Sequence, residues 1–537
     1  MPVVAGWLTG EQVSPAVIEQ TLQAMEEVLA LHGGEPARST QPGAGLVAFA
    51  DAAYATPDYK EPPVLDWIPE RRTLLYRRPL SGLHPLYYIA DWPAPGNLLF
   101  ASEIKALFAV GVPRRLHLAA LDALLRFGFI PAPWTAFQQI AVVPAGSLLR
   151  WQHAKLFVNH TTDFRMPELE DRTTPPPPTL DELTAILAQA CSCMLPSHEQ
   201  FAALAGGGPA AALATLLLAQ QTRTDFPIAT IGSTRTQRTK AWKEVERLAA
   251  FCQHSQLAIT GSTQPEFWLA TLQATETPSI DTRSLALHQL LHTTAAETNA
   301  RVAFSGLGAQ TLLGSQAVRP TGKFGSKQGP QEPLIQRYMR TTVPHKEGAI
   351  TSTLWSDEAR IALHDAEPWE TTLHARKLLR QAEQFSQSAQ GVHYLDLHLR
   401  LPDQLVLPFQ QLAQQEQIAL RSLYLHKQVM PMLIRNASDS DTATDPLTQL
   451  MQHYAPALST RPARLPLAMP LTLAQQKDTS ELVEQVLSRE AIQNTGLFQP
   501  AIIEQLRQQA TQQAPSPTLL LAFTTQLLCQ LFQIEGW

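Results

Sequence analysis

The chain has 537 residues, of which 45% are hydrophobic and 16% are charged, and its formal net charge is -6. This length allows two or more domains, each with a hydrophobic core of its own. The weak negative charge argues against a surface that binds nucleic acid.

The first part of the sequence, from Val3 to about Phe164, has the composition of a β-rich domain. Short apolar runs between turn residues predict strands at 46–50, 73–76, 85–90 and 98–100. Two helices are predicted at 102–109 and 118–126. Residues 166–179 then form an acidic segment with four consecutive prolines, which favours an extended spacer. We therefore place a domain boundary at residues 166–180.

Beyond this spacer, predicted strands and helices alternate. The expected helices span 180–194, 210–221, 243–252 and 284–299, and the expected strands span 201–204, 226–231, 257–260 and 302–305. Such alternation is typical of a parallel sheet with helices on both faces. Residues 317–345 are basic and show no period, so we expect a surface loop, and the chain from 355 onward is expected to be mostly helical.

Three glycines mark the turn after the predicted strand 201–204. Gly206, Gly207 and Gly208 allow a tight turn, and Pro209 suits the first position of the following helix. A helix N-terminus beside such a turn can hold an anion, because its first N–H groups have no partner in the helix. The loop contains no Asp, Ser, Thr or Lys to hold a metal or a phosphate. Nucleotide binding by backbone groups and a plain strand–helix turn are the two interpretations.

No targeting or membrane segment is predicted. The first residues lack a basic segment and a long apolar run, so they do not resemble a signal peptide. The uncharged runs 200–222 and 508–534 are long enough to span a membrane. The glycines and proline of the first and the glutamines of the second favour a buried strand–turn–helix and an amphipathic helix. We expect a cytoplasmic protein without membrane contacts.

The cysteines and histidines predict no metal site. Cys191 and Cys193 form a C-x-C pair, but no second pair or nearby histidine cluster completes a ligand set. We interpret both as packing residues. His393, His398 and His426 are interpreted as histidines on helix surfaces.

Several segments resemble the glutamine-dependent asparagine synthetases. In the first part, residues 85–88 (PLYY), 99–107 (LFASEIKAL), 127–131 (FGFIP) and 143–146 (VPAG) follow the glutaminase half of that family. The resemblance covers essentially the whole chain, with a gap in the first domain. It implies an α/β protein with a truncated glutaminase-like domain of the Ntn-hydrolase α+β sandwich type at 1–165. A proline-rich linker at 166–180 would precede an ATP-pyrophosphatase-like (PP-loop) synthetase domain at 181–537.

The same resemblance shows which family side chains this sequence replaces. The family has a nucleophilic cysteine where Pro2 stands, and an aspartate in its nucleotide loop where Pro209 stands. Its second loop aligns with residues 305–310, where Ser305 and Gly306 are kept but Leu307 and Gln310 replace two acids that help to hold magnesium. Further family charges are replaced by neutral residues at these positions: Pro79, His84, Pro408, Gln410 and Gln411.

A few charged residues remain as candidates for substrate binding. Glu276 lies in a segment similar to the family's Asp-Glu-Pro, and Arg421 is the one charge kept in a helical segment at 401–426. Arg464 lies near the place of a family lysine. For Glu276 a loop cap or a surface acid, and for Arg421 a pairing with a helix carboxylate, are the alternative interpretations.

Three functions compete at this point. The first is a catalytically inactive pseudoenzyme that acts as a partner, scaffold or regulatory subunit of another protein. That protein would be an active relative or a second copy of the chain. The second is an ATP-dependent amide ligase with a rearranged site built from Glu276, Arg421 and Arg464. The third is a small-molecule sensor that uses the old cleft. No cofactor is expected, and ATP and magnesium belong only to the ligase alternative.

Overall fold

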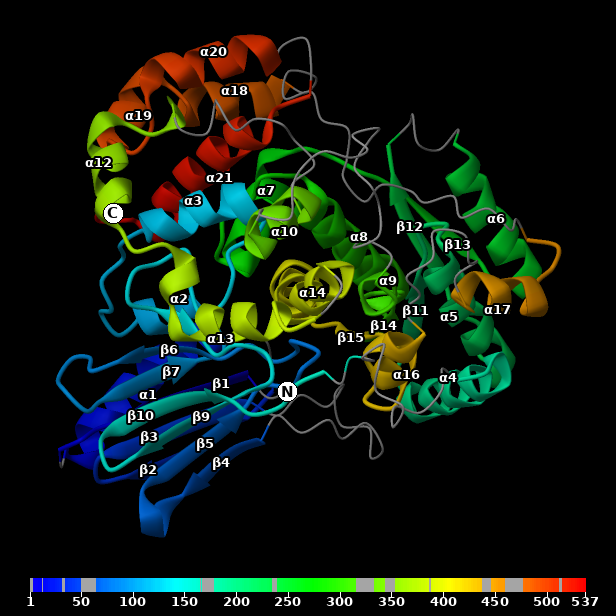
Figure 1. Cartoon of the computed structure of the whole chain (residues 1–537), viewed down its shortest axis with the longest axis horizontal. Coiled ribbons are helices and arrows are strands. Elements are labelled where there is room, and N and C mark those ends of the chain that lie inside the picture. Colours follow the sequence, from blue (N-terminus) through cyan, green and yellow to red (C-terminus); the bar gives the residue numbers. More distant parts are fainter. Residues whose placement is uncertain are drawn as a thin grey trace.

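A computed structural model provides the fold of the chain. It describes residues 3–11, 13–30, 34–49, 64–164, 166, 178–233, 239–314, 333–342, 353–385, 388–436, 446–458, 477–510 and 514–537. Within these residues the chain forms two antiparallel sheets, a parallel sheet and a layer of helices beside them (Figure 1). None of the described helices combines the length and the apolar character needed to cross a membrane.

The N-terminal domain is a sandwich of two antiparallel sheets. One sheet has the order β2-β3-β1-β7-β6-β8 and the other β10-β9-β5-β4. Their strands are β1 (Val3–Leu8), β2 (Pro36–Gln41), β3 (Ala44–Phe49), β4 (Val64–Ile68), β5 (Thr73–Arg77), β6 (Tyr87–Ala90), β7 (Leu98–Ala101), β8 (Ala141–Val142), β9 (Ser147–Gln152) and β10 (Lys155–His160). An apolar core that includes Tyr76, Phe100 and Trp151 lies between the sheets.

Helices cover the outer face of the six-stranded sheet. They are α1 (Pro15–Leu29) and α2 (Ile104–Phe108), whereas α3 (Leu118–Phe127) packs against helices of the second domain. The prediction of a β-rich segment missed α1 and the strands β1, β2, β4, β8, β9 and β10. Four buried residues spaced three or four apart, Ile18, Leu22, Met25 and Leu29, turn one face of α1 toward β1 and β3. The contact is close, because a side chain at Gly45 would lie 2.3 Å from Ile18.

The second domain is built on a five-stranded parallel sheet. Its order is β13-β12-β11-β14-β15, with strands β11 (Phe201–Leu204), β12 (Ile228–Gly232), β13 (Gln256–Thr260), β14 (Val302–Phe304) and β15 (Ala419–Arg421). The chain starts at the central strand β11, moves outward to β13, and then crosses to β14 on the other side. The carboxyl ends of β11 and β14 therefore meet where the strand order reverses, and ligands of open α/β sheets bind at such places.

Helices pack on both faces of this sheet, as the alternating pattern predicts. One apolar core contains residues of α4 (Leu180–Met194), α5 (Pro209–Gln221), α6 (Lys240–Cys252), α16 (Val429–Arg435) and α17 (Pro446–Tyr454). Another contains residues of α7 (Pro265–Thr275), α8 (Arg283–Thr298) and α15 (Leu407–Gln415). Helix α4 and strand β11 have the predicted bounds, and α5 begins one residue earlier than expected.

Further helices pack around this core, some beside the N-terminal sandwich and others on the side away from it (Figure 1). They are α9 (Ala309–Leu312), α10 (Leu334–Thr342), α12 (Asp357–Asp365), α13 (Leu373–Ala382), α14 (Ser388–Leu395), α18 (Lys477–Val486), α19 (Arg489–Thr495), α20 (Pro500–Ala510) and α21 (Pro517–Phe532). A π-helix, Asp396–Val406, continues α14. Helix α21 is buried around most of its surface, and not amphipathic as its glutamines suggested.

Two sequence predictions concern segments that the structure describes only in part. The expected surface loop at 317–345 contains α10, which was missed, and its Tyr338 packs into an apolar cluster with α13 and α14. The rest of that loop lies outside the described residues. Most of the proposed linker at 166–180 also lies outside the described residues, so the domain boundary there stays a prediction.

Candidate functional site

The glycine turn connects β11 to α5 at the point where the strand order reverses. Gly207 has φ of +74°, a left-handed conformation that favours glycine. A side chain at Gly206 would meet no atom within 4 Å, so this face of the turn is open. Gly208 is the N-cap of α5 and Pro209 occupies its first position. The backbone is therefore a glycine turn that leads into a helix N-terminus, as predicted.

A second loop, residues 305–308, lies directly against this turn. A side chain at Gly306 would come within 2.7 Å of the backbone nitrogen of Ala211, in the first turn of α5. Only glycine allows the loop to approach so closely. The hydroxyl of Ser305 accepts a long hydrogen bond, 3.4 Å, from the N–H of Leu307. The structure thus brings together the two loops that the sequence singled out.

The two positions at which the resemblance implies acids, 307 and 310, carry neutral side chains. Leu307 is half-buried and packs against both of the large apolar cores. Gln310 is half-buried on the short helix α9. Neither residue offers a carboxylate for a divalent cation. Pro2 and Arg464 lie outside the described residues, so their assignments stay predictions.

Arg421 lies at the end of β15 with 2% of its surface exposed. Its guanidinium donates to the carbonyl oxygen of Met194, the last residue of α4. Its own carbonyl accepts a hydrogen bond from the N–H of Ser305, with the two atoms 2.9 Å apart. Arg421 therefore holds the second loop through a backbone hydrogen bond with Ser305, while its guanidinium donates to the carbonyl of Met194.

Glu276 lies at the boundary between the two domains. It is fully buried and accepts hydrogen bonds from the N–H groups of Ile104, at 2.8 Å, and Lys105, at 2.7 Å. These groups begin α2 of the N-terminal domain, so Glu276 caps a helix of the other domain, and its interpretation as a surface acid is wrong. Burial raises the pKa of Glu276, whereas the nearby ammonium of Lys105 opposes that rise.

Further buried polar contacts cross the same boundary. One carboxylate oxygen of Asp403, on the π-helix, accepts from the N–H of Ala132 at 2.9 Å, and the other lies 4.0 Å from the guanidinium of Arg78. Burial raises the pKa of Asp403 to about 6, although Arg78 and Ala132 act against this. The side-chain amide of Gln411 donates to the hydroxyl of Tyr87 at 3.0 Å.

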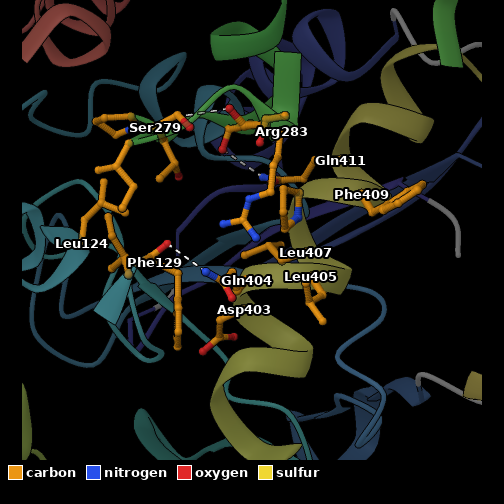
Figure 2. A pocket seen from close by; sticks show the side chains of 18 of the residues that line it. Leu124, Phe129, Ser279, Arg283, Asp403, Gln404, Leu405, Leu407, Phe409 and Gln411 are labelled. Atoms are coloured by element: carbon orange, nitrogen blue, oxygen red, sulfur yellow. Dashed lines mark hydrogen bonds between the residues drawn. The ribbon is translucent and has the colours of Figure 1, made fainter. Parts of the chain in front are cut away.

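These contacts surround a cavity of about 210 Å³ between the domains. Residues 128–130 line it from the N-terminal domain, and residues 277–281 and 403–405 line it from the second domain. Figure 2 shows Arg283 reaching from the wall near Ser279 toward Gln404 on the opposite wall. Arg283 is held by Asp281, whose carboxylate accepts from its Nε at 2.6 Å.

Sequence reasoning did not identify this cavity, although it quoted several of its residues. The FGFIP segment and the family positions Pro408 and Gln411 all contribute to its walls. Arg283 and Gln404 carried no motif and were missed. The interpretation of His393, His398 and His426 as surface residues is wrong, because each has 5% or less of its surface exposed. His393, for example, has its Nε2 atom 2.9 Å from the carbonyl of Thr311.

Comparison with known protein families supports both halves of this architecture. Residues 65–162 match the glutamine amidotransferase domain, and residues 182–536 match asparagine synthase. The N-terminal sandwich and the parallel-sheet domain are therefore the two domains that the resemblance implied. The search of curated proteins finds no match.

Proposed function

The chain belongs to the asparagine synthase family, and on that premise we propose that it is a non-catalytic member that serves another protein as a partner, scaffold or regulatory subunit. The position of Leu307 carries this proposal. In the loop beside the glycine turn, an apolar side chain packs against both large cores. Magnesium binds oxygen ligands and offsets the charge of a triphosphate, and Leu307 offers no such ligand.

The surroundings of the two loops support the same view. Among the residues that the structure describes, one group of three or more metal-ligating side chains comes together, and it contains no residue of either loop. The nearby Gln310 is neutral, and the guanidinium of Arg421 is engaged by the carbonyl of Met194. The fold is retained by apolar packing and backbone contacts, while the charges that chemistry needs are replaced.

An assay for pyrophosphate tests the loss of catalysis. The full chain is incubated with ATP, magnesium and aspartate, together with glutamine or ammonium, and a broader panel of carboxylic acids replaces aspartate in parallel. We expect no pyrophosphate above the level without protein, whereas an active asparagine synthetase under the same conditions gives the positive control. Release by the chain itself would favour the ligase alternative, and an Arg421→Ala variant would then test its site.

A second experiment tests the partner role. We expect the chain either to associate with itself or to bind an intact asparagine-synthetase-like relative when the two are co-expressed. Native mass spectrometry measures the stoichiometry of each complex, and the activity of the relative is compared with and without the chain. A monomer that neither binds the relative nor changes its activity would contradict this role.

The cavity between the domains favours one further candidate, a small-molecule sensor. Its walls combine apolar residues with the guanidinium of Arg283, which suits a small ligand with an acidic group. Calorimetry with aspartate, asparagine, glutamine, AMP and ATP tests this candidate. If one of them binds, Arg283→Ala should weaken binding at least about tenfold, and Arg360→Ala, at an exposed position, is the matched control.

A further inference from the structure

Three side chains of metal-ligating type meet between the two domains, outside the cavity and both loops. His160 ends β10 of the N-terminal sandwich, Asp163 follows it, and His398 belongs to the π-helix of the second domain. One ligand atom from each can be chosen so that all three lie within 4.8 Å of one another. His398 has 2% of its side chain exposed and Asp163 has 29%, so the group is shielded yet reachable.

The hydrogen bond of His398 to a backbone carbonyl determines which of its ring nitrogens can bind a metal. Its Nδ1 atom lies 2.9 Å from the carbonyl oxygen of Tyr394, and only a protonated nitrogen can pair with a carbonyl. In neutral imidazole the Nε2 atom then carries the lone pair. The Nε2 atom lies 2.7 Å from a carboxylate oxygen of Asp163. A proton on Nε2 makes this contact an ion pair, and a metal ion bound by both residues would replace that proton.

Asp163 is held in place by its other carboxylate oxygen. The hydroxyl of Tyr394 donates to that oxygen at 3.1 Å. Tyr394 therefore orients both ligands, Asp163 through its hydroxyl and His398 through its carbonyl. Metal sites in proteins are commonly supported by such outer contacts, which fix the tautomer and direction of each ligand.

The ring nitrogens of His160 are buried. No described side chain forms a hydrogen bond with them, and the Nε2 atom of His374 on α13 is likewise buried without such a partner. The ring centre of His160 lies 5.6 Å from that of His398 and 6.2 Å from that of His374. Two imidazole rings on one tetrahedral zinc have their centres about 5 Å apart. The spacing of the His160 and His398 rings is therefore close to that of two zinc ligands, and His374 lies next to His160.

A second histidine group in the chain lacks these features. The Nε2 atom of His288 lies 2.8 Å from a carboxylate oxygen of Glu416, and its Nδ1 atom lies 2.9 Å from the hydroxyl oxygen of Thr271. Both of its ring nitrogens therefore have partners. His292 contacts the same carboxylate at 3.0 Å and is half exposed. In that group every buried ring nitrogen has a hydrogen-bond partner. The group around His398 includes Nε2 of His374, which is buried without one among the described residues.

We propose that His160, Asp163 and His398 bind one Zn²⁺ ion, with His374 as the fourth ligand, and that this ion joins the N-terminal sandwich to the helices of the second domain. Two or three imidazole nitrogens with one carboxylate oxygen suit zinc, and four protein ligands make a closed, structural site. The ammonium of Lys377 lies nearby and donates to the carbonyl of His160 at 3.3 Å. It adds one positive charge beside the site.

Metal analysis of the full chain tests this proposal. The protein is stripped with a chelator, equilibrated with Zn²⁺, separated from free metal, and analysed by mass spectrometry for metals. We expect one zinc per chain and a rise of the melting temperature on zinc addition. The Co²⁺-loaded protein should show the visible absorption of a tetrahedral site. Zinc that does not stay bound, or stoichiometric iron in its place, overturns the assignment.

Variants separate a metal site from a purely structural cluster. Asp163→Asn keeps the shape of the side chain and should weaken zinc binding about 100-fold or more, while Tyr394→Phe should weaken it about tenfold. His292→Ala, in the second histidine group, should leave the affinity unchanged, and circular dichroism checks that each variant folds. Equal affinity in Asp163→Asn and the unchanged chain overturns the proposal. So does a His398 ring protonated on both nitrogens in the zinc-equilibrated protein, measured by ¹⁵N NMR.

Discussion

The backbone N–H of His84 donates a hydrogen bond to the side-chain oxygen of Gln410, and the two atoms lie 2.6 Å apart across the domain boundary. Both residues are buried, with 6% and 4% of their surfaces exposed. The resemblance implies a lysine and an aspartate at these positions. In this chain a neutral hydrogen bond joins the two residues, so their contact links the domains without an ion pair.

Replacing Gln410 with alanine should weaken this link. The N–H of His84 would remain buried without a partner, which costs about 1 to 3 kcal/mol. We expect the free energy of unfolding to fall by that amount, measured with urea and tryptophan fluorescence. Gln384→Ala removes an exposed glutamine and is the matched control, for which no change is expected. Equal stability of the two variants would show that the contact does not form.

The stability of the chain should also depend on the protonation of Asp403. Its pKa is raised to about 6 in the folded chain, so the folded state retains a proton that the unfolded state loses at lower pH. The contribution of this group is therefore fully present at about pH 4 and lost as the pH rises through 6. The difference between the pKa of about 6 in the folded chain and about 4 in the unfolded chain corresponds to up to about 3 kcal/mol of unfolding free energy.

Asp403→Asn tests this dependence, because asparagine does not titrate. The difference in unfolding free energy between the variant and the unchanged chain should shift by up to about 3 kcal/mol toward the variant between pH 4 and pH 7.5. The variant also loses the Arg78 contact, which adds the same offset at both pH values. The change of the free-energy difference between pH 4 and pH 7.5 is therefore the quantity to compare. Asp365→Asn, at an exposed position, should show no such shift. A flat difference for both variants would refute the raised pKa.

Alanine at Gly306 should destabilise the paired loops. Its side chain would lie 2.7 Å from the nitrogen of Ala211, so the backbone has to move, and we expect a loss of about 1 to 3 kcal/mol. Gly206→Ala is the matched control, since nothing lies within 4 Å of that position. There we expect unchanged stability or a gain of up to about 1 kcal/mol. Thermal unfolding of both variants checks the contrast.

Aspartate at position 307 tests whether packing holds the second loop. Leu307 contacts both large cores, so a charge there should lower the free energy of unfolding by about 1 to 3 kcal/mol. Gln310→Asp places the same side chain at a half-buried position in the adjacent helix and should cost less. Urea unfolding compares the two. If Leu307→Asp proves as stable as the unchanged chain, the loop is not held by this side chain.

The sequence predicted the elements that short-range patterns define. Strand 201–204 and helix 180–194 have their predicted bounds, and the helix begins with a capping box between Thr179 and Glu182. Helix α1 was missed although its buried residues follow a helical period, because the surrounding strands dominated the interpretation. Helix α10 was missed because glycines and prolines on its N-terminal side suggested a loop.

The site could be predicted only in part, because its polar contacts join distant segments. Glu276 caps a helix that begins 172 residues earlier, at Ile104, and no local pattern indicates such a partner. The burial of His398 is equally invisible in the sequence, since it depends on the π-helix facing the N-terminal sandwich. The glycine loops were predictable because their spacing to neighbouring strands and helices is local.

The contact between His84 and Gln410 has a consequence for synthesis of the chain. The two residues are 326 positions apart, so at 5–20 residues per second a ribosome needs roughly 15 to 65 s to reach the second after the first. During that interval the face of the N-terminal sandwich that later packs against the second domain is exposed to solvent. Chaperones and proteases would meet that face first, and slow translation would prolong its exposure.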